Sequence, residues 1–293
     1  MNLSGQTAVV TGGGNGIGRA LCLSLAAKGA NVVVADIELA PAEAVVSEIT
    51  AFGAKAIATR VDVTDEQDVE RLADRAWSAF GSAELLVNNA GVMHATSPLV
   101  ETTNADYQWI FSVNVGGLLN GIRTFIPRFI EAGTPAHVLN TGSEHSLGVP
   151  HVGGGLYTAS KHAVLGISDV LRQELPANIG ISVLCPGIVG TTLWRAGERR
   201  QAEFGDTPPA SAEAGAVMQH LGMNAQEVAD KAVTGIESGE FLIVTHPHAI
   251  DIAKRRWTEI ESAFSTQAPR FEGDDKYDLN QLMRKMNKHT KEE

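Results

Sequence analysis

The chain alternates between short, almost wholly apolar runs and longer amphipathic segments. The short runs are rich in β-branched residues, and continuous apolar runs of about four to eight residues are typical of strands buried on both faces of a parallel sheet. The longer segments carry apolar residues at helical spacing. We expect strands at 7–11, 31–36, 56–63, 85–89, 137–143, 181–185 and 241–245. We expect helices at 17–27, 41–51, 66–80, 104–132 and 156–175.

This alternation predicts the fold class. Consecutive strand–helix–strand units with right-handed crossovers build a doubly wound sheet that is covered by helices on both faces. No low-complexity linker divides the first 190 residues. We therefore expect one α/β domain of the Rossmann type, with a mainly parallel seven-stranded sheet and a C-terminal helical extension.

Two regions interrupt the alternation. Residues 191–225 are rich in Ala, Gly, Glu and Gln, and so long an insert is typical of a lid, a binding loop or a disordered segment. Residues 251–293 begin as an amphipathic helix and become mostly charged, too polar for a core of their own. We place a catalytic domain at 1–250, with 191–225 as its substrate loop, and a helical extension with a charged tail at 251–293.

Composition narrows the class of function. The 293 residues are 44% hydrophobic, which supports a sizeable core, and carry a formal charge of −11. This acidic balance argues against a surface that binds nucleic acid. The sequence has no apolar run of about 18 residues, so we expect no membrane-spanning helix. The N-terminus lacks the pattern of a signal peptide. Cys22 and Cys185 lie in apolar patterns, so we expect buried thiols in a cytoplasmic protein.

A glycine-rich segment, GGGNGIG at 12–18, joins the first strand to the first helix. Glycines let the backbone approach a diphosphate, whose charge the helix N-terminus stabilises. Asp36 ends the second strand, where a carboxylate binds the adenosine ribose and repels a 2′-phosphate. No Arg or Lys stands at Asn15, Ile37 or Glu38, so the pattern favours NAD over NADP. The alternative for Asp36 is a solvated acid at a strand end.

Further motifs follow in order along the chain. They are Asn-Asn-Ala-Gly at 88–91, Asn114, Ser143, Tyr157-x-x-x-Lys161 and Pro186-Gly187. Together with the glycine spacing, and over about residues 3–193, this combination resembles the short-chain dehydrogenase/reductase family of the NAD type. The resemblance implies an enzyme that transfers hydride between a nicotinamide and an alcohol or carbonyl carbon.

The chemistry of alcohol oxidation points to Tyr157 and Lys161. A phenol has a pKa of about 10 and is a poor base at neutral pH, but a neighbouring cation lowers that pKa. The two residues are spaced i,i+4 and share one helix face. We expect Tyr157 to act as general base and acid, and Ser143 to hold the substrate oxygen. The alternative for Ser143 is a structural turn residue.

The resemblance also implies roles in the site. Asn114 would hold a kink in its helix, where Gly116-Gly117 follow. A backbone carbonyl freed by the kink would bind a water that connects Lys161 to solvent as a proton relay. Asp62 would contact the adenine, although it could instead cap the helix near residues 65–66. The implied cofactor-binding residues are Gly12, Asn15, Gly16, Ile17, Gly18, Asp36, Asp62, Val63, Asn89, Tyr157, Lys161, Val189 and Thr191.

The substrate pocket is expected to be mostly apolar, which favours a hydrophobic secondary alcohol or ketone, aromatic or alicyclic compounds included. No histidine spacing brings three metal ligands together, so we expect no metal. The expected wall residues are Leu147, Val149, Val152, Leu156, Leu193, Trp194, Met218, Leu221 and Met223.

Alternatives remain for function and assembly. One is an NADPH-linked carbonyl or 3-oxoacyl-type reductase, which Asp36 disfavours. Another is a non-catalytic NAD-binding regulator, which the presence of Ser143, Tyr157 and Lys161 disfavours. The C-terminal ending is similar to that of bacterial members that oxidise benzylic or other bulky secondary alcohols. We expect a homodimer through the helices that contain Asn114 and Tyr157, with a tetramer as the alternative.

Overall fold

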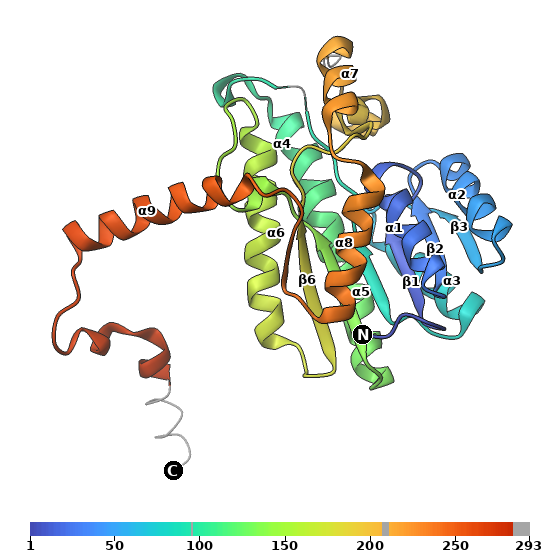
Figure 1. Cartoon of the computed structure of the whole chain (residues 1–293), viewed down its shortest axis with the longest axis horizontal. Coiled ribbons are helices and arrows are strands. Elements are labelled where there is room, and N and C mark those ends of the chain that lie inside the picture. The colour runs from blue at the N-terminus through green and yellow to red at the C-terminus, as the bar shows by residue number, and fades with distance from the viewer. Residues whose placement is uncertain (95, 207–210, 284–293) are drawn as a thin grey trace. The chain divides into compact units, whose positions relative to one another are not determined.

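Seven parallel strands form one sheet in the order β3-β2-β1-β4-β5-β6-β7 (Figure 1). The computed structural model describes residues 1–94, 96–206 and 211–283. The predicted seven-stranded α/β fold is confirmed. The strands are β1 (Thr7–Thr11), β2 (Asn31–Asp36), β3 (Ala56–Arg60), β4 (Leu85–Asn88), β5 (Ala136–Thr141), β6 (Ile179–Cys185) and β7 (Leu242–Val244).

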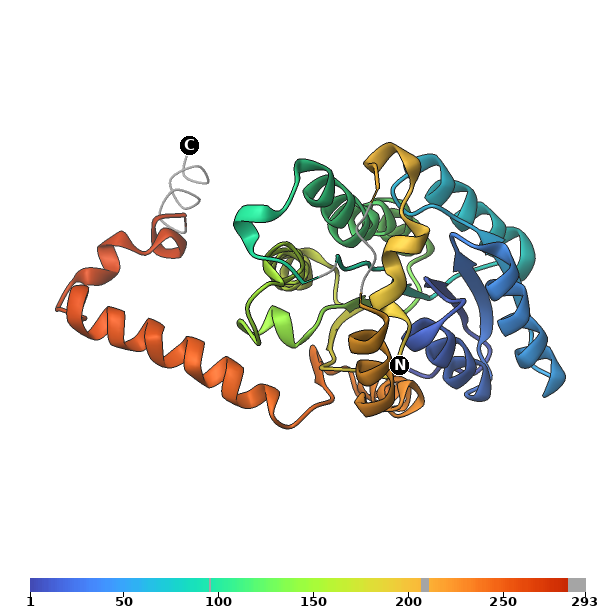
Figure 2. The same ribbon diagram turned by 90° about the horizontal axis from the view of Figure 1, so that it is seen from above.

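Helices cover both faces of the sheet (Figure 2). The strands are apolar on both faces, so their side chains pack against the helices on either side of the sheet. Each face has its own apolar cluster between sheet and helices. One face carries α1 (Gly16–Ala27), α2 (Leu39–Ala51) and α8 (Ala225–Ser238). The other carries α3 (Glu66–Phe80), α4 (Asn104–Phe111), α5 (Gly117–Ala132) and α6 (Gly155–Glu174).

The strand order reverses between β1 and β4, and hydrogen bonds join the carboxyl ends of these two strands. Thr11 Oγ1 accepts from the backbone N–H groups of Asn89 and Ala90, at 3.0 and 3.1 Å. The Asn89 side chain donates in return to Thr11 O at 3.0 Å and to Gly12 O at 3.2 Å. Ligands of doubly wound sheets bind at such a switch point, so these contacts position the site.

The expected helix at 104–132 is interrupted by a π-helical turn at Ser112–Gly116. Within that turn, Asn114 Oδ1 accepts from Val92 N at 2.8 Å, and Nδ2 donates to Val92 O and Ser160 Oγ, both at 3.0 Å. The extra residue in the turn directs Asn114 inward between α6 and the segment after β4. The kink predicted at Asn114 is confirmed.

Three expectations about elements were wrong. β3 ends at Arg60 rather than 63, because the chain turns at Asp62, whose Oδ1 accepts from Thr64 N and Oγ1 at 3.0 and 2.7 Å. Helix α8 was missed, although Val228, Ala229, Ala232, Val233 and Ile236 follow helical spacing and are buried. Within 191–225, α7 (Ala212–Leu221) was missed as well, and residues 207–210 of that segment lie outside the described residues.

The chain divides into two units, Met1–Ile252 and Ala253–Glu293. The second unit contains most of α9 (Ala249–Gln267) and the 3₁₀ turn η6 (Asp274–Tyr277). The amphipathic helix predicted there is present, and its Trp257, Ile260 and Phe264 are 38% exposed or more. Residues 284–293 of the expected tail lie outside the described residues. In the described parts of the chain, no helix is long and apolar enough to cross a membrane.

Candidate active site

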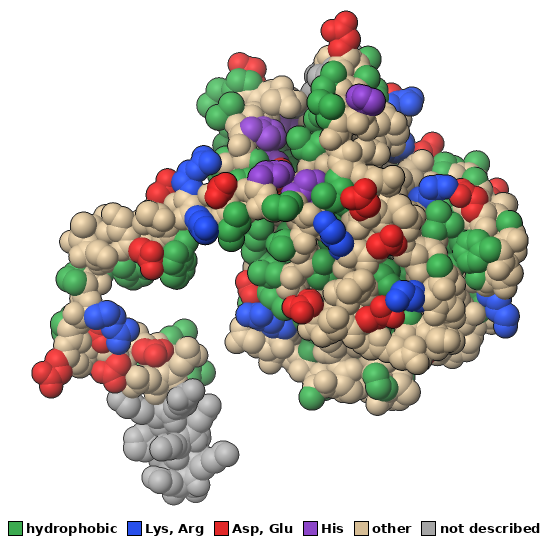
Figure 3. Space-filling model, viewed as in Figure 1, with side chains coloured by type: hydrophobic (Ala, Val, Ile, Leu, Met, Phe, Trp, Pro, Cys, Tyr) green, Lys and Arg blue, Asp and Glu red, His purple; other side chains and the backbone are tan. Residues whose placement is uncertain are grey.

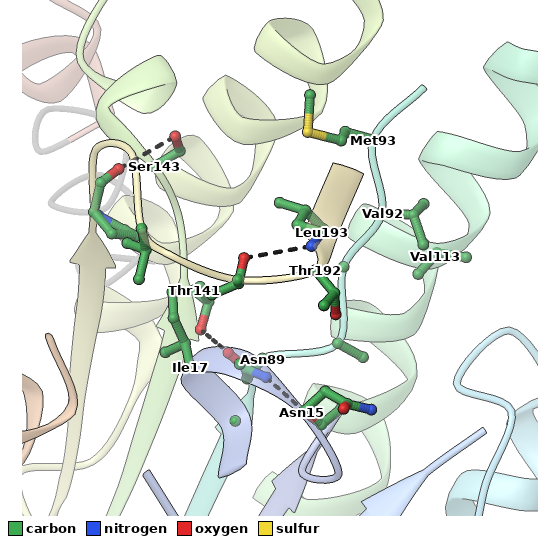
Figure 4. A pocket seen from close by; sticks show the side chains of 18 of the residues that line it. Asn15, Ile17, Asn89, Val92, Met93, Val113, Thr141, Ser143, Thr192 and Leu193 are labelled. Atoms are coloured by element: carbon green, nitrogen blue, oxygen red, sulfur yellow. Dashed lines mark hydrogen bonds between the residues drawn. The ribbon is translucent and has the colours of Figure 1, made fainter. Parts of the chain in front are cut away.

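A cavity of about 420 Å³ opens at the carboxyl ends of the strands. Its walls come from the glycine-rich segment, the ends of β2, β4, β5 and β6, helix α6 and the segment after β6. Figure 4 shows Ser143 on one side, Val92 and Met93 on the other, and Leu193 between them. Every site residue predicted from the sequence lines this cavity except Asn114.

Ser143, Tyr157 and Lys161 come together at one end of the cavity. Ser143 follows β5, and its hydroxyl lies near the Tyr157 side chain, which α6 presents, and donates to Pro186 O at 3.4 Å. Lys161, one turn further along α6, donates from Nζ to Thr141 O at 2.8 Å. Its Nζ lies 5.6 Å from the centroid of the Tyr157 ring. The predicted cluster of a serine, a phenol and a cation therefore exists in space.

Burial dominates the proton affinities in this cluster. Desolvation raises the pKa of Tyr157 to about 12, and the negative charge of Glu144 contributes to the rise. The Ser143 side chain lowers this pKa, but by less than burial raises it. Burial also lowers the pKa of Lys161 to about 8. The sequence predicted that the Lys161 cation lowers the pKa of Tyr157. In the folded chain this pKa is raised instead.

Asn114 lies behind the cavity wall rather than in it. A Cβ atom added to Gly91 would lie 3.4 Å from Asn114 Oδ1 and 3.5 Å from Lys161 Nζ. The amide and the ammonium group are thus both adjacent to Gly91. The proton-relay role implied for Asn114 stays a prediction.

The glycine-rich segment has the form of a diphosphate-binding turn. Gly12 and Gly16 have positive φ of 62° and 53°, and a Cβ on Gly18 would lie 2.0 Å from Gly12 O. Asn15 caps α1 without a side-chain hydrogen bond, and the first turn holds no acidic residue. The first N–H groups of α1 are therefore suited to an anion, and the residues present fit a dinucleotide.

Asp36 is buried at the end of β2 and lines the cavity. Its carboxylate accepts from Gly14 N at 2.9 Å and from Glu38 N at 3.1 Å. The alternative of a solvated strand-end acid is wrong, because the side chain is enclosed. These bonds also show that Asp36 helps to hold the glycine-rich segment.

Asp62 lies in the same wall, beside Val63. It does not cap helix α3, since that cap is Asp65, which accepts from Gln67 N. The capping alternative for Asp62 is therefore wrong. Its carboxylate instead holds a local turn at Thr64 and accepts from Gln201 Nε2 at 3.1 and 3.0 Å.

Sequence reasoning missed Arg199 and Gln201 as cavity residues. Arg199 is the last residue of the 3₁₀ helix η4 (Leu193–Arg199), and Gln201 lies two residues further on. Both are far along the chain from Asp36 and Asp62. Arg199 Nη1 lies 3.7 Å from Glu38 Oε2, next to the predicted adenosine site. No local signal could have found this pair, because only the fold brings the segments together.

Histidines that follow β7 hold the loop after β6. Gly187 N donates to His246 Nδ1 at 2.9 Å, and His246 Nε2 lies 3.0 Å from Ile188 O. His248 Nε2 lies 2.9 Å from Glu144 Oε2, and Glu144 follows Ser143 directly. The sequence placed these histidines after a strand but did not predict that they join two loops of the site.

Several histidine side chains gather on the face shown in Figure 3. His145 lies closest to the chemistry, with its ring centroid 5.1 Å from that of Tyr157 and 5.0 Å from that of His151. Burial lowers the pKa of His145 to about 4, so its ring is neutral at neutral pH. Among the described residues, no group of His, Cys, Asp and Glu is arranged to hold a metal.

The apolar wall differs from the expected one. Of the nine residues expected, only Leu193, Trp194 and Met218 line the cavity. The others are core or surface residues, since helix periodicity does not show which apolar side chains face a cavity. Val92 and Val113 line the cavity instead, together with Met93, which follows Asn-Asn-Ala-Gly and fits the wall position that the sequence also predicts for it (Figure 4). The residues that do not line it are Leu147, Val149, Val152, Leu156, Leu221 and Met223.

Comparison with known proteins agrees with this geometry. The sequence pattern of the family described as short chain dehydrogenase matches residues 6–202. The chain belongs to this family. This short-chain dehydrogenase is 38% identical over 225 residues to 1-deoxy-11-beta-hydroxypentalenate dehydrogenase of Streptomyces exfoliatus, covering 76% of this chain and 82% of that protein. It is 34% identical over 215 residues to 3beta-hydroxysteroid dehydrogenase 2 of Eggerthella lenta, covering 73% and 82%.

A solved structure is similar over nearly the whole chain. A short chain dehydrogenase/reductase of Burkholderia phymatum in complex with NAD superimposes with a TM-score of 0.85 at 32% identity, covering 92% of this chain and 99% of that one. The predicted family and Rossmann-type fold are confirmed. The short-chain dehydrogenase described here is therefore an oxidoreductase.

Proposed function

We propose that this short-chain dehydrogenase is NAD(H)-dependent and transfers hydride between the nicotinamide and a hydrophobic secondary alcohol or ketone. One observation carries the proposal. A single cavity is lined by Ser143, Tyr157 and Lys161 and also by the glycine-rich turn with Asp36. Proton transfer and dinucleotide binding thus have their residues in one continuous space.

The roles of the three residues follow from their geometry. The Ser143 hydroxyl lies near the Tyr157 phenol in the same cavity, so both oxygens are available to one substrate oxygen. In oxidation Tyr157 takes the hydroxyl proton, and in reduction it returns that proton to the carbonyl oxygen. A bound nicotinamide would supply the hydride acceptor and, when oxidised, would add positive charge to the site. Lys161 adds a second charge and, through its bond to Thr141 O, keeps its ammonium group beside the ring.

Cofactor preference depends on Asp36 and Arg199. The buried Asp36 carboxylate disfavours a 2′-phosphate at the ribose. Arg199 is a cation at the same end of the cavity and supports the alternative, an NADPH-linked reductase. Because Arg199 lies near Glu38, whose charge opposes it, we favour NAD.

The apolar wall and the relatives support a bulky substrate. Val92, Met93, Val113, Leu193 and Trp194 offer hydrophobic surface in the same cavity as Tyr157. Two relatives are named as dehydrogenases of hydroxypentalenate and of hydroxysteroids. We infer an alicyclic or aromatic secondary alcohol rather than a sugar or a charged metabolite.

The test combines binding with turnover. NAD and NADP affinities are measured by titration calorimetry, and absorbance at 340 nm is followed with a panel of aromatic, alicyclic and steroid-like secondary alcohols. We expect tighter binding of NAD and NADH formation with one class of alcohol. Turnover only with NADP would establish the alternative, and binding without turnover across a broad panel would favour a non-catalytic regulator.

We also propose that residues 1–250 form the catalytic domain and that the protein is a homodimer through α5 and α6. Ile130 on α5 and Val170 on α6 are 53% and 54% exposed, which leaves apolar side chains for a partner. Light scattering at micromolar concentration should give twice the mass of the 31.0 kDa chain. A monomer mass would contradict the dimer.

A further inference from the structure

A short segment beyond η4 is fixed over one end of the cavity by a buried ion pair. Arg200 Nη1 lies 2.6 Å from Asp106 Oδ1, and the two side chains are 2% and 12% exposed. The Arg200 guanidinium also donates from Nε to Phe204 O at 3.1 Å and lies 4.9 Å from the Trp109 ring centroid. Arg200 therefore anchors its two neighbours, Arg199 and Gln201.

Gln201 faces the part of the cavity predicted to hold the adenine. Its Nε2 donates to both oxygens of Asp62, at 3.1 and 3.0 Å. Its Oε1 is buried and has no hydrogen-bond partner among the described residues. A buried acceptor without a donor is unfavourable, so a ligand that supplies a donor beside Asp62 is stabilised there.

The missing donor has a defined chemistry. An acceptor pair formed by a carboxylate and an amide oxygen matches a primary amino group, which has two N–H donors. The exocyclic amino group of adenine is such a group, and the terminal torsion of glutamine is soft enough to adjust to it. We propose that Gln201 binds the adenine amino group together with Asp62. The inference rests on the proposed dinucleotide function.

This arrangement makes Gln201 a determinant of base specificity. Hypoxanthine has a carbonyl oxygen where adenine has the amino group, so the donor that Gln201 Oε1 and Asp62 would share is absent at that position. A substitution at Gln201 should therefore affect ligands with adenine and leave those with hypoxanthine unaffected. A general loss of cavity shape would weaken both.

The experiment measures binding of ADP-ribose and of its hypoxanthine counterpart by titration calorimetry, with no turnover involved. The variants are Gln201→Leu and a matched control, Gln226→Leu, whose amide bonds Ser24 and Asp230 away from the cavity. One lost hydrogen bond of about 1–1.5 kcal/mol corresponds to a roughly tenfold weaker affinity. We expect that loss for ADP-ribose with Gln201→Leu, an unchanged affinity for the hypoxanthine ligand, and no effect of Gln226→Leu.

The outcomes separate the inference from the function on which it rests. Equal weakening of both ligands, or no weakening of ADP-ribose, would overturn the role of Gln201 while leaving dinucleotide binding intact. Absence of ADP-ribose binding in the unmodified protein would overturn the proposed function itself, and the inference with it.

Discussion

Tyr157 is the residue on which the proposed chemistry most directly depends. Tyr157→Phe removes the hydroxyl but keeps the ring that contacts His145. Because general acid–base catalysis contributes about 10²–10⁴-fold, we expect turnover to fall by that factor in steady-state assays. NAD affinity should change less than about threefold, since a lost proton-transfer group is used only in the transition state. Wild-type turnover of the variant would contradict the assigned role.

Asp36 is predicted to select against the 2′-phosphate through its charge. Asp36→Asn removes that charge and retains an acceptor for Gly14 N, which the carboxylate now holds at 2.9 Å. We expect the ratio of NADP to NAD affinity to rise by roughly tenfold, about 1.4 kcal/mol, in calorimetric titrations. Asp36→Ala serves as the comparison, since it also removes the bond to the glycine-rich segment and should weaken both cofactors. An unchanged ratio in Asp36→Asn would show that the ribose is recognised elsewhere.

The sequence predicted those site residues that lie close together along the chain. Tyr157 and Lys161 share a helix face because four residues separate them, and their motif shows this directly. Arg199, Gln201 and His246 were missed, because their positions follow from the packing of distant segments. The pKa of Tyr157 could not be predicted either, since it depends on burial in the folded protein rather than on neighbours in the chain.

At the scale of elements, apolar periodicity predicted most strands and helices, and the Asn114 motif predicted the break in the helix at 104–132. The miss at α8 has a different cause. Its buried face follows helical spacing, so the pattern was available in the sequence, but the segment directly continues the Ala-rich and Gly-rich insert, which was expected to be a loop. The number and type of elements thus follow from the pattern, whereas the insert required tertiary contacts such as Gly215 against the Trp194 ring.

The contact of α5 with β4 depends on Gly121. A Cβ at that position would lie 2.3 Å from Asn88 Oδ1, and Asn88 Nδ2 donates to Asn140 Oδ1 at 3.0 Å. Gly121→Ala should therefore lower the free energy of unfolding by about 1–3 kcal/mol, although alanine favours a helix by about 1 kcal/mol. Urea denaturation measures the change. Gly166→Ala on α6 is the matched control, because its Cβ has open space, and it should be neutral or stabilising.

The stability of the whole molecule is expected to depend on a buried histidine between two strands. His137 on β5 has Nε2 2.8 Å from Ser182 Oγ on β6, and the Ser182 hydroxyl donates to Glu240 O. The serine oxygen therefore accepts from His137 Nε2–H. Protonation would place a charge in the core, and burial lowers the pKa of His137 to about 4.

The direction of the pH dependence follows from this depressed pKa. As pH falls below about 6.5, His137 becomes protonated in the unfolded chain but stays neutral in the folded chain until pH reaches about 4. The unfolded state therefore binds more protons in this window, and the free energy of unfolding falls as pH falls. Between pH 7.5 and 5.0 the loss is about 2 kcal/mol for this one group. In urea denaturation, His137→Gln should reduce the pH dependence of the protein by that amount. The exposed His220→Gln should leave it unchanged. Equal pH dependence in His137→Gln and the unmodified protein would show that His137 takes up its proton in the folded state without cost.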